Sequence, residues 1–503
     1  MPLPPVKAET VVAVLYIGSV IGSIVGGYMC DRFGRRTCIL WTDTAFLLGA
    51  IVLASAPNYG TILLGRFLVG ISVGVSALAD VSYLAEISPE DRRGALVSCN
   101  EASVSVGFLL AYIFSYVITV TIEYEEGWRI MFACSGLIAL TQWFFMLGLP
   151  ESPVWLDDQG REAEAAEALK VIHRGCYDSA WQESGHGKGE DIEVLAVQPK
   201  EEEKPAFLLN EDGPPHPHEH QPLLHYWRQF VIVIVLAISQ QLCGQINILN
   251  FAPEIFSEVF YGSTAVTDGD STMLLGTNII LGVVKFFITS LVIWEVDMVG
   301  RRFLLLGGMS IITLSLLCLV AAFSSETGEE GQFSQVQKAL SLMGTTGVVA
   351  GYAMSYGPLT WLITSEMFPS NIRGRTIGFM TVLTYAFAAV ISYTFLTGQE
   401  ILGPAGPFVM YLMFSLCSLA FGYLAIPNTA NVEVGGDGEE VDNLLNQTWI
   451  WRQQWCRRCC PRGDIPSQQE DVGAREALEN CFEDSGEGNT MAISAVTGLP
   501  EVT

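Results

Sequence analysis

The sequence predicts an all-α polytopic membrane protein, and three observations point to this class. Hydrophobic residues make up 50% of the chain and charged residues only 16%, a mixture that suits a lipid environment better than several soluble domains. The hydrophobic residues gather in segments of the length that a helix needs to cross a hydrocarbon core of ~30 Å. These segments are continuous rather than alternating, which excludes an outer-membrane β-barrel.

Each predicted helix is a long apolar segment with few charged residues, interrupted by Gly and Pro. Helices are the only regular structure that satisfies a lipid-exposed backbone within one segment. We expect eleven spans, at residues 11–29, 37–56, 62–84, 95–122, 130–149, 230–260, 272–294, 303–323, 339–364, 376–397 and 406–426.

Basic residues in the short loops predict the orientation of the helices. Loops on one side carry arginines, and the alternate loops carry Asp and Glu. Because basic loops stay in the cytoplasm, the arginine side is predicted to be cytoplasmic, together with the C-terminus. We expect a multi-pass protein of the plasma membrane or an endomembrane. The arginines concerned are Arg32, Arg35, Arg36, Arg92, Arg93, Arg301, Arg302, Arg373 and Arg375.

The net charge of −27 comes mainly from two polar segments. Residues 150–227 hold 17 acids and 6 bases, and residues 431–503 hold 14 acids and 5 bases. This acid excess excludes a nucleic-acid binder and is typical of solvated, largely disordered segments. The expected organisation is a helical bundle at 1–149, a linker with an amphipathic helix over 157–174 at 150–227, a six-helix bundle at 228–427, and an acidic tail at 428–503.

An internal repeat relates the two predicted bundles. Residues 31–36 (DRFGRR) recur as 297–302 (DMVGRR), 266 residues later, and residues 86–94 (EISPEDRRG) recur as 366–374 (EMFPSNIRG), 280 residues later. The chain therefore resembles two copies of one helical unit. Two spans precede the motif in the second copy and one in the first, so we expect a first helix to be missing from a set of twelve.

The repeated motifs place carboxylates and guanidinium groups at connections between helices. Arginine holds carboxylates with a planar, bidentate fork, so these charges are interpreted as a cytoplasmic gate that interleaves across the two halves. The alternative is that basic loops only orient the protein. The predicted gate residues are Asp31, Arg35, Arg36, Glu86, Arg93, Asp297, Arg301, Arg302, Glu366 and Arg373.

Amide side chains gather within one apolar span, close to Gly244 and Pro253; they are Gln240, Gln241, Gln245, Asn247 and Asn250. An unsatisfied amide in lipid costs several kcal/mol, so these groups must face a partner. An amide both donates and accepts, as does a hydroxyl-rich substrate. Hydrogen bonding between helices is the alternative.

The ordered set of motifs resembles the sugar-porter branch of the major facilitator superfamily. The resemblance reaches to about residue 427 and is greatest to the facilitative glucose transporter class that contains members ten and twelve. The resemblance to the branch rests on DRFGRR, Gly65-Arg66, Tyr83 with Glu86, GWR at 127–129, PESP at 150–153, QQLCG at 240–244, DMVGRR, and GPLTW at 357–361 followed by Glu366 and Arg373. The resemblance to this class rests on Asn100-Glu101, Gly244-Gln245 with Asn247, and Val283-Val284-Lys285.

The resemblance implies a fold of two pseudo-symmetric helical bundles and a site for a sugar. It implies that Gln240, Gln241 and Trp361 bind the substrate. It also places Glu101 and Lys285 at sugar-lining positions, and we hypothesise that these two charges approach one another as an ion pair or through the sugar. The alternative is that water and backbone carbonyls satisfy each separately. For Asp43 and Asp80 structural bonds between helices are favoured over a functional role.

These observations predict a secondary carrier rather than an enzyme. It would move a hexose or related polyol by alternating access, with or without protons. The sequence contains no phosphate-binding loop motif, so nothing indicates that ATP drives transport. We expect no cofactor, no metal and no obligate protein partner. The predicted partners are a neutral sugar and the lipid bilayer, and the predicted substrate residues are Gln240, Gln241, Asn247, Asn250, Trp361, Glu101 and Lys285. A non-transporting sugar sensor, or an inactive truncated carrier, is the alternative.

Overall fold

The structure is a computed structural model, and it describes residues 4–88, 93–122, 124–183, 226–261, 268–324, 333–368 and 370–427, with positions 445, 448 and 450. The chain forms two compact units, Met1–Trp449 and Ile450–Thr503, and the description below concerns the first. Most of the acidic linker and the acidic tail lie outside the described residues, so their predicted disorder stays a prediction.

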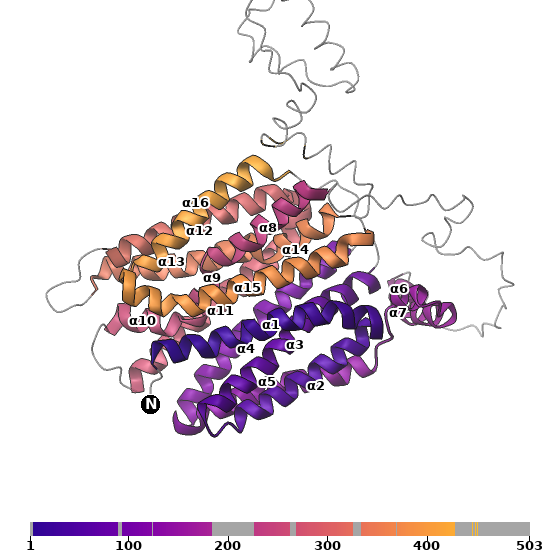
Figure 1. The fold of residues 1–503 in the computed structure, drawn as a ribbon, viewed down its shortest axis with the longest axis horizontal. Helices are drawn as coiled ribbons and strands as arrows, with labels where there is room; N and C mark the ends of the chain where they lie inside the picture. The colour runs from indigo at the N-terminus through magenta and orange to yellow at the C-terminus, as the bar shows by residue number, and fades with distance from the viewer. Residues whose placement is uncertain are drawn as a thin grey trace, which may run out of the picture. The chain divides into compact units, whose positions relative to one another are not determined.

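The described elements are all α-helices, as the sequence predicts (Figure 1). The N-terminal group contains α1 (Pro5–Phe33), α2 (Arg35–Ala54), α3 (Tyr59–Ile87), α4 (Arg93–Thr121) and α5 (Tyr124–Leu147). Two helices follow outside it, α6 (Pro153–Asp158) and α7 (Glu162–Glu183). The C-terminal group contains α8 (Trp227–Leu242), α9 (Gln245–Asn250), α10 (Ala252–Tyr261), α11 (Asp268–Val299), α12 (Arg301–Ser324), α13 (Gln335–Met354), α14 (Tyr356–Met367), α15 (Ser370–Leu402) and α16 (Gly406–Ala425).

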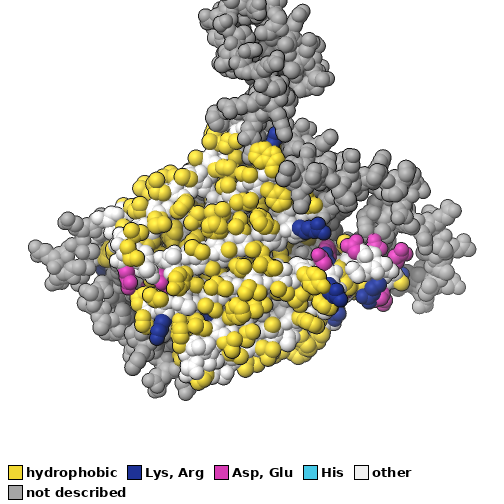
Figure 2. Space-filling model, viewed as in Figure 1, with side chains coloured by type: hydrophobic (Ala, Val, Ile, Leu, Met, Phe, Trp, Pro, Cys, Tyr) yellow, Lys and Arg dark blue, Asp and Glu magenta, His cyan; other side chains and the backbone are white. Residues whose placement is uncertain are grey.

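The described part of the chain has ten helices long and apolar enough to cross a membrane. The eleventh predicted span, 339–364, is divided at Ser355 between α13 and α14. Large apolar side chains face outward along the helices; Trp294 is 79% exposed and Phe145 73% exposed. Figure 2 shows this apolar surface over the middle of the molecule, with the charged side chains toward its edges. Such a surface is stable in lipid and not in water.

Gly244 divides the predicted span 230–260, as its Gly and Pro content indicates. Its backbone has φ +76°, a left-handed conformation that favours glycine. A Cβ atom there would lie 2.3 Å from Cδ2 of Tyr411 on α16. The chain therefore leaves α8 after Leu242 and starts α9 at Gln245, beside the predicted substrate residues.

The two groups of helices contact each other mainly where α1 packs against α15 and α4 against α11, with smaller contacts of α3 with α15 and α4 with α14. In the first pair, the carboxylate of Glu9, which has no exposed surface, accepts from the Thr397 backbone N–H (2.9 Å) and hydroxyl (2.7 Å). In the second, the Ser105 and Thr289 hydroxyls lie 3.0 Å apart. Hydrogen bonds between polar side chains thus connect the apolar helices, as is usual in a membrane, where lipid offers no hydrogen-bond partner.

The predicted amphipathic helix of the linker begins later than expected, at Glu162, because the chain turns at Gly160 (φ +72°) after the short helix α6. Ala165 and Ala168 pack against Trp155 in a small buried cluster. The Trp155 indole donates to the Asp31 carbonyl at 2.9 Å, which holds the start of the linker against the end of α1.

Substitution of Gly244 by Ala is expected to lower the melting temperature of the purified protein. A left-handed conformation costs an L-residue about 1–2 kcal/mol, and the new methyl group would also meet the Tyr411 ring. Gly276→Ala is the matched control, because a Cβ at Gly276 meets no atom within 4 Å. Equal melting temperatures for the two variants would contradict the strain assigned to Gly244.

Candidate functional site

The turn between α1 and α2 builds the first predicted charge cluster. Gly34 has φ +93°, so the chain reverses in a single residue and α2 begins at Arg35. Arg35 Nε lies 2.9 Å from Glu86 Oε1 on α3, and its Nη2 lies 3.6 Å from Asp31 on α1. One half-buried guanidinium group thereby connects three helices, as the motif predicts. We call this end of the helices the arginine end.

A further carboxylate at the arginine end, Glu151, is missing from the predicted gate. Glu151 accepts from the backbone N–H of Arg36 at 2.8 Å and of Thr37 at 3.3 Å. The neighbouring Ser152 hydroxyl donates to Glu86. The sequence could have indicated these two residues, because both belong to the PESP motif at 150–153.

The second copy of the motif repeats the geometry of the first. Gly300 has φ +93°, and Arg301 Nε lies 3.1 Å from Glu366 Oε1. Arg302 donates to the Tyr423 carbonyl at 2.7 Å. The Arg35–Glu86 pair and the Arg301–Glu366 pair each join helices of the same group. The side chains of Arg93, Asp297 and Arg373 lie outside the description, so interleaving of the charges across the two groups remains a prediction.

Gln240 lies on α8, just before the break at Gly244, and is buried. Its Nε2 donates to the Tyr352 hydroxyl at 2.9 Å and to the Tyr356 carbonyl at 3.4 Å. Its Oε1 is buried and has no hydrogen-bond partner among the described residues. The two bonds fix the orientation of the amide and leave its acceptor oxygen available.

Asn247 and Asn250 lie on α9, after the break. Asn247 donates to the Ile391 carbonyl (3.0 Å) and the Tyr411 hydroxyl (2.7 Å), and its Oδ1 has no partner in the described chain. Asn250 donates to the Tyr16 hydroxyl on α1 at 3.1 Å. The first amide therefore lies within the C-terminal group, whereas the second connects the two groups.

Glu101 and Lys285 face each other across the two groups without direct contact. The described ion pairs do not include one between them within 4.0 Å, although their charges interact. Lys285 Nζ lies 4.1 Å from the centroid of the Phe108 ring, a cation–π contact. Phe108 lies two turns beyond Glu101 on α4, so Lys285 contacts the helix that carries Glu101.

The other predicted residues lie on the same helices. Gln241 is buried on α8 beside Gln240, and Trp361 lies half-buried on α14. A Cβ at Gly357, one turn before Trp361, would lie 3.6 Å from Glu101 Oε2. The structure thus brings α4, α8, α11 and α14 together around the predicted substrate residues.

Sequence reasoning missed the tyrosines of this region. Tyr352 holds Gln240, Tyr411 holds Asn247 and Tyr16 holds Asn250. The charge of Glu101 acts on Tyr352 and on Tyr385 of α15. A tyrosine within an apolar span needs a partner for its hydroxyl, and that signal could have identified them.

The arrangement has the features of a secondary carrier. Two groups of membrane helices each carry a repeated arginine turn, and neutral amides and tyrosine hydroxyls gather beside a helix break in the C-terminal group. Such a break at mid-membrane is where carriers place their binding sites. Comparisons with known proteins identify the family.

The chain belongs to the sugar transporter family of the major facilitator superfamily. Residues 5–436 match the profile of the family described as "Sugar (and other) transporter". The chain is therefore a membrane transporter and not an enzyme, and its fold and family favour a carrier over the sensor that the sequence left as an alternative.

Relatives from animals and bacteria support this assignment. The chain is 28% identical to facilitated glucose transporter member 10 of Danio rerio, over 90% of this chain and 88% of that protein. It is 30% identical to the major myo-inositol transporter IolT of Bacillus subtilis, over 84% and 82%. The partially occluded, inward-open xylose transporter XylE of E. coli has a TM-score of 0.65 and 25% identity, with 85% and 90% covered.

Glu366→Gln is expected to destabilise the protein more than Glu86→Gln. The Glu366 side chain is 2% exposed and that of Glu86 17% exposed, and removing one partner of a buried ion pair costs about 3–5 kcal/mol. Thermal unfolding in detergent measures the difference. Glu164→Gln is the control, because its pair with Arg161 is exposed and exposed pairs contribute little. A smaller effect for Glu366→Gln than for Glu86→Gln would contradict this ranking.

Proposed function

We propose that the protein carries a hexose or related polyol across its membrane by alternating access, with the substrate bound beside the break between α8 and α9. The observation that carries this proposal is the buried amide of Gln240. Its N–H donors are used by protein groups, and its oxygen has no partner in the described chain. Leaving a buried polar atom unpaired costs about 1–3 kcal/mol, and a substrate hydroxyl would supply the missing donor.

Several further polar atoms fit a polyhydroxyl ligand. Buried atoms without a described partner occur on α9, α11, α14 and α15; they are Asn247 Oδ1, Asn278 Oδ1, Thr360 Oγ1 and Thr384 Oγ1. Amides and hydroxyls match hydroxyl groups that both donate and accept. Trp361 and Gln241 complete the proposed site, the indole ring offering an apolar face to the sugar ring. Glucose, myo-inositol and xylose, named for the relatives above, are all neutral and rich in hydroxyls.

The contacts between the two groups support alternating access. The hydrogen bonds that join them extend from the middle of the helices to the end opposite the arginine turns; they are Ser105–Thr289, Tyr16–Asn250, Tyr112–Leu249 and Glu9–Thr397. We propose that this form is closed at that end, and that the arginine end is cytoplasmic because its loops are basic. Breaking the Glu9–Thr397 contact and closing the arginine end would then expose the site to the other side.

We also propose that Glu101 and Lys285 interact through the bound sugar. The described ion pairs do not include one between the two charges, but each charge acts on the other. A sugar has hydroxyls on opposite edges, so one molecule can accept from the ammonium group and donate to the carboxylate. A charge inside the membrane is costly unless it has such a role or partner.

Saturable uptake of labelled sugar tests the proposed function. The full-length chain is reconstituted in lipid vesicles, and uptake of D-glucose, D-xylose and myo-inositol is compared with that of protein-free vesicles. Gln240→Leu is expected to raise KM about five- to 150-fold, because loss of one hydrogen bond to a buried group costs about 1–3 kcal/mol. Gln159→Leu, at an exposed turn, is the control. Uptake equal to that of protein-free vesicles for all three sugars would refute the proposal.

Exchanging the two intramembrane charges tests their interaction. Glu101→Gln and Lys285→Gln are each expected to reduce sugar uptake at least tenfold, because each leaves the opposite charge without compensation. The double exchange Glu101→Lys with Lys285→Glu restores a neutral pair and is expected to recover part of the uptake. Unchanged uptake in both single variants would show that the charges play no part in transport.

A further inference from the structure

Asp43 on α2 and Asp80 on α3 are acids within membrane helices that neither the sugar site nor the arginine end uses. Asp43 is 6% exposed, and its Oδ2 has no hydrogen-bond partner among the described residues. Asp80 accepts from the Ser76 hydroxyl on its own helix. The sequence favoured structural bonds between helices for these acids, but the described bond lies within α3. Asp43 therefore needs another explanation.

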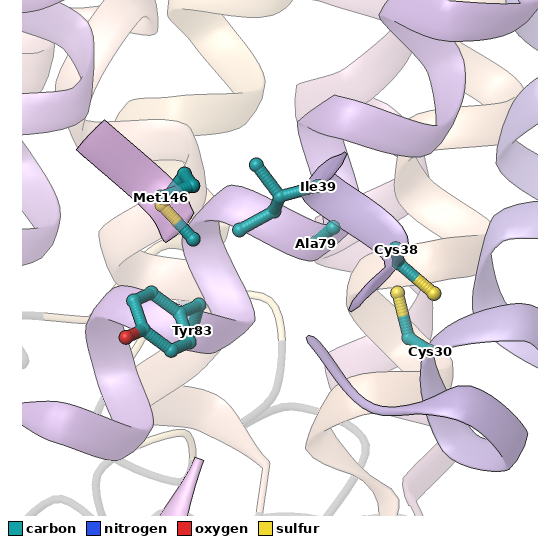
Figure 3. Close-up of a cluster of buried hydrophobic side chains, with 6 residues drawn as sticks. All are labelled: Cys30, Cys38, Ile39, Ala79, Tyr83 and Met146. Carbon is teal, nitrogen blue, oxygen red and sulfur yellow. The ribbon is translucent and has the colours of Figure 1, made fainter. Parts of the chain in front are cut away.

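The packing of α2 against α3 brings the two acids to the same level. The helices are antiparallel, and a Cβ at Gly49 would meet the Val69 side chain at 2.7 Å. Ten residues nearer the arginine end, Ile39 shares a buried cluster with Ala79 (Figure 3). These two contacts lie on either side of Asp43 on α2, and on either side of residues 70–78 on α3.

Asp43 consequently lies beside Ser76, and Ser76 bonds to Asp80 one turn further on. Asp43 and Ile39 are four residues apart and share one face of α2, the face that contacts α3. The charge of Asp80 acts on Asp43 across this interface. The two carboxylates and the serine hydroxyl thus form a single cluster of one buried and two half-buried side chains, with Asp43 Oδ2 as its unpartnered atom among the described residues.

The described neighbours supply no compensating positive charge. Asp43 and Asp80 form no described ion pair, and the basic groups of the packed helices are used elsewhere. Arg35 pairs with Glu86. Arg36 donates to the Met146 and Leu147 carbonyls, and Arg129 donates to the Ala54 carbonyl. Arg66 lies over the Phe132 ring. The other titratable neighbours are the Cys30 and Cys38 thiols and the hydroxyls of Tyr83 and Tyr385. Two adjacent carboxylates in a low-dielectric interior cannot both remain ionised without a cation.

We propose that Asp43 and Asp80 form a proton-binding site, which couples proton movement to the sugar transport proposed above. One proton from water binds a carboxylate oxygen and is shared between the two acids, which lowers their combined charge from −2 to −1. The inference rests on the proposed sugar carrier and adds its driving ion.

The position of the cluster explains how a proton would affect transport. Asp80 is six residues from Glu86 on α3, so the same helix carries the acid cluster and the ion pair of the arginine end. Tyr385 connects it to the sugar site, because the charges of both Asp80 and Glu101 act on this tyrosine. Binding or release of the proton changes the charge at the interface of α2 and α3, next to the elements that open and close the site.

Accumulation of sugar against its gradient tests the proposal. The full chain is reconstituted in vesicles, and labelled hexose is measured with and without an inward proton gradient. With one proton per sugar, a gradient of one pH unit supports about tenfold accumulation. Asp43→Asn and Asp80→Asn are expected to abolish accumulation while exchange of labelled for unlabelled hexose continues. Glu400→Gln, an exposed acid on α15, is the control and is expected to accumulate sugar as the wild type does.

Three results would overturn the proposal while the sugar carrier stands. One is hexose exchange in the wild type with no accumulation under a proton gradient. Another is accumulation by both Asn variants at the wild-type level. Accumulation driven by a sodium gradient instead of a proton gradient would also overturn it, by assigning the pair to a metal cation.

Infrared difference spectroscopy separates failure of this proposal from failure of the proposed function. Acidification of the wild type is expected to produce the band of a buried protonated carboxyl group, and the double Asn variant is expected to lose it, whether or not sugar is transported. Should the Asn variants fail to fold, Ser76→Ala keeps both acids but removes the donor that favours ionised Asp80. It is expected to move the midpoint of the band to higher pH. A wild type without the band, or an unmoved midpoint, would refute the proton site.

Discussion

The structure depends on one constraint: lipid offers no hydrogen bonds, so every polar group along the helices needs a partner inside the protein. The Thr397 backbone N–H and hydroxyl both bind the buried carboxylate of Glu9, and the Ser105 hydroxyl lies against Thr289. Polar side chains are therefore concentrated between helices rather than on their outer faces. The interfaces that must rearrange during transport are the ones that contain these hydrogen bonds. We therefore expect each polar group to exchange one partner for another as the protein changes conformation, rather than to lose its hydrogen bonds.

The arginine turns show one local solution used twice. Gly34 and Gly300 have the same φ of +93°, because both turns reverse the chain in one residue and deliver an arginine to a carboxylate on a later helix. The two copies differ in their surroundings. Glu86 also accepts from Ser152, at the start of the linker, whereas Glu366 is more deeply buried. The first turn is thus connected to the segment that joins the two groups, and the second is held mainly by its own group.

The sequence predicted the spans and the arginine turns, because each depends on residues near one another in the chain. It also identified the amides, whose polarity is conspicuous in an apolar segment. It did not predict the break at Ser355. It also missed the bonds of Glu151 and of the tyrosines that hold the amides, because the two partners of each bond are more than a hundred residues apart in the chain. The contact of Lys285 with Phe108 likewise depends on how α11 packs against α4, which no local pattern encodes.

The direction of the hydrogen bonds at Gln240 determines what the site can recognise. Because the Gln240 amide donates to the Tyr352 hydroxyl oxygen, the hydroxyl proton of Tyr352 is free to donate to another acceptor. The same amide keeps its oxygen unpaired. The site therefore presents an acceptor and a donor on adjacent side chains, the complement of a hydroxyl group that donates and accepts at once. A cation or an anion would use only one of the two, so the pair favours a neutral, hydroxyl-bearing ligand over a charged one.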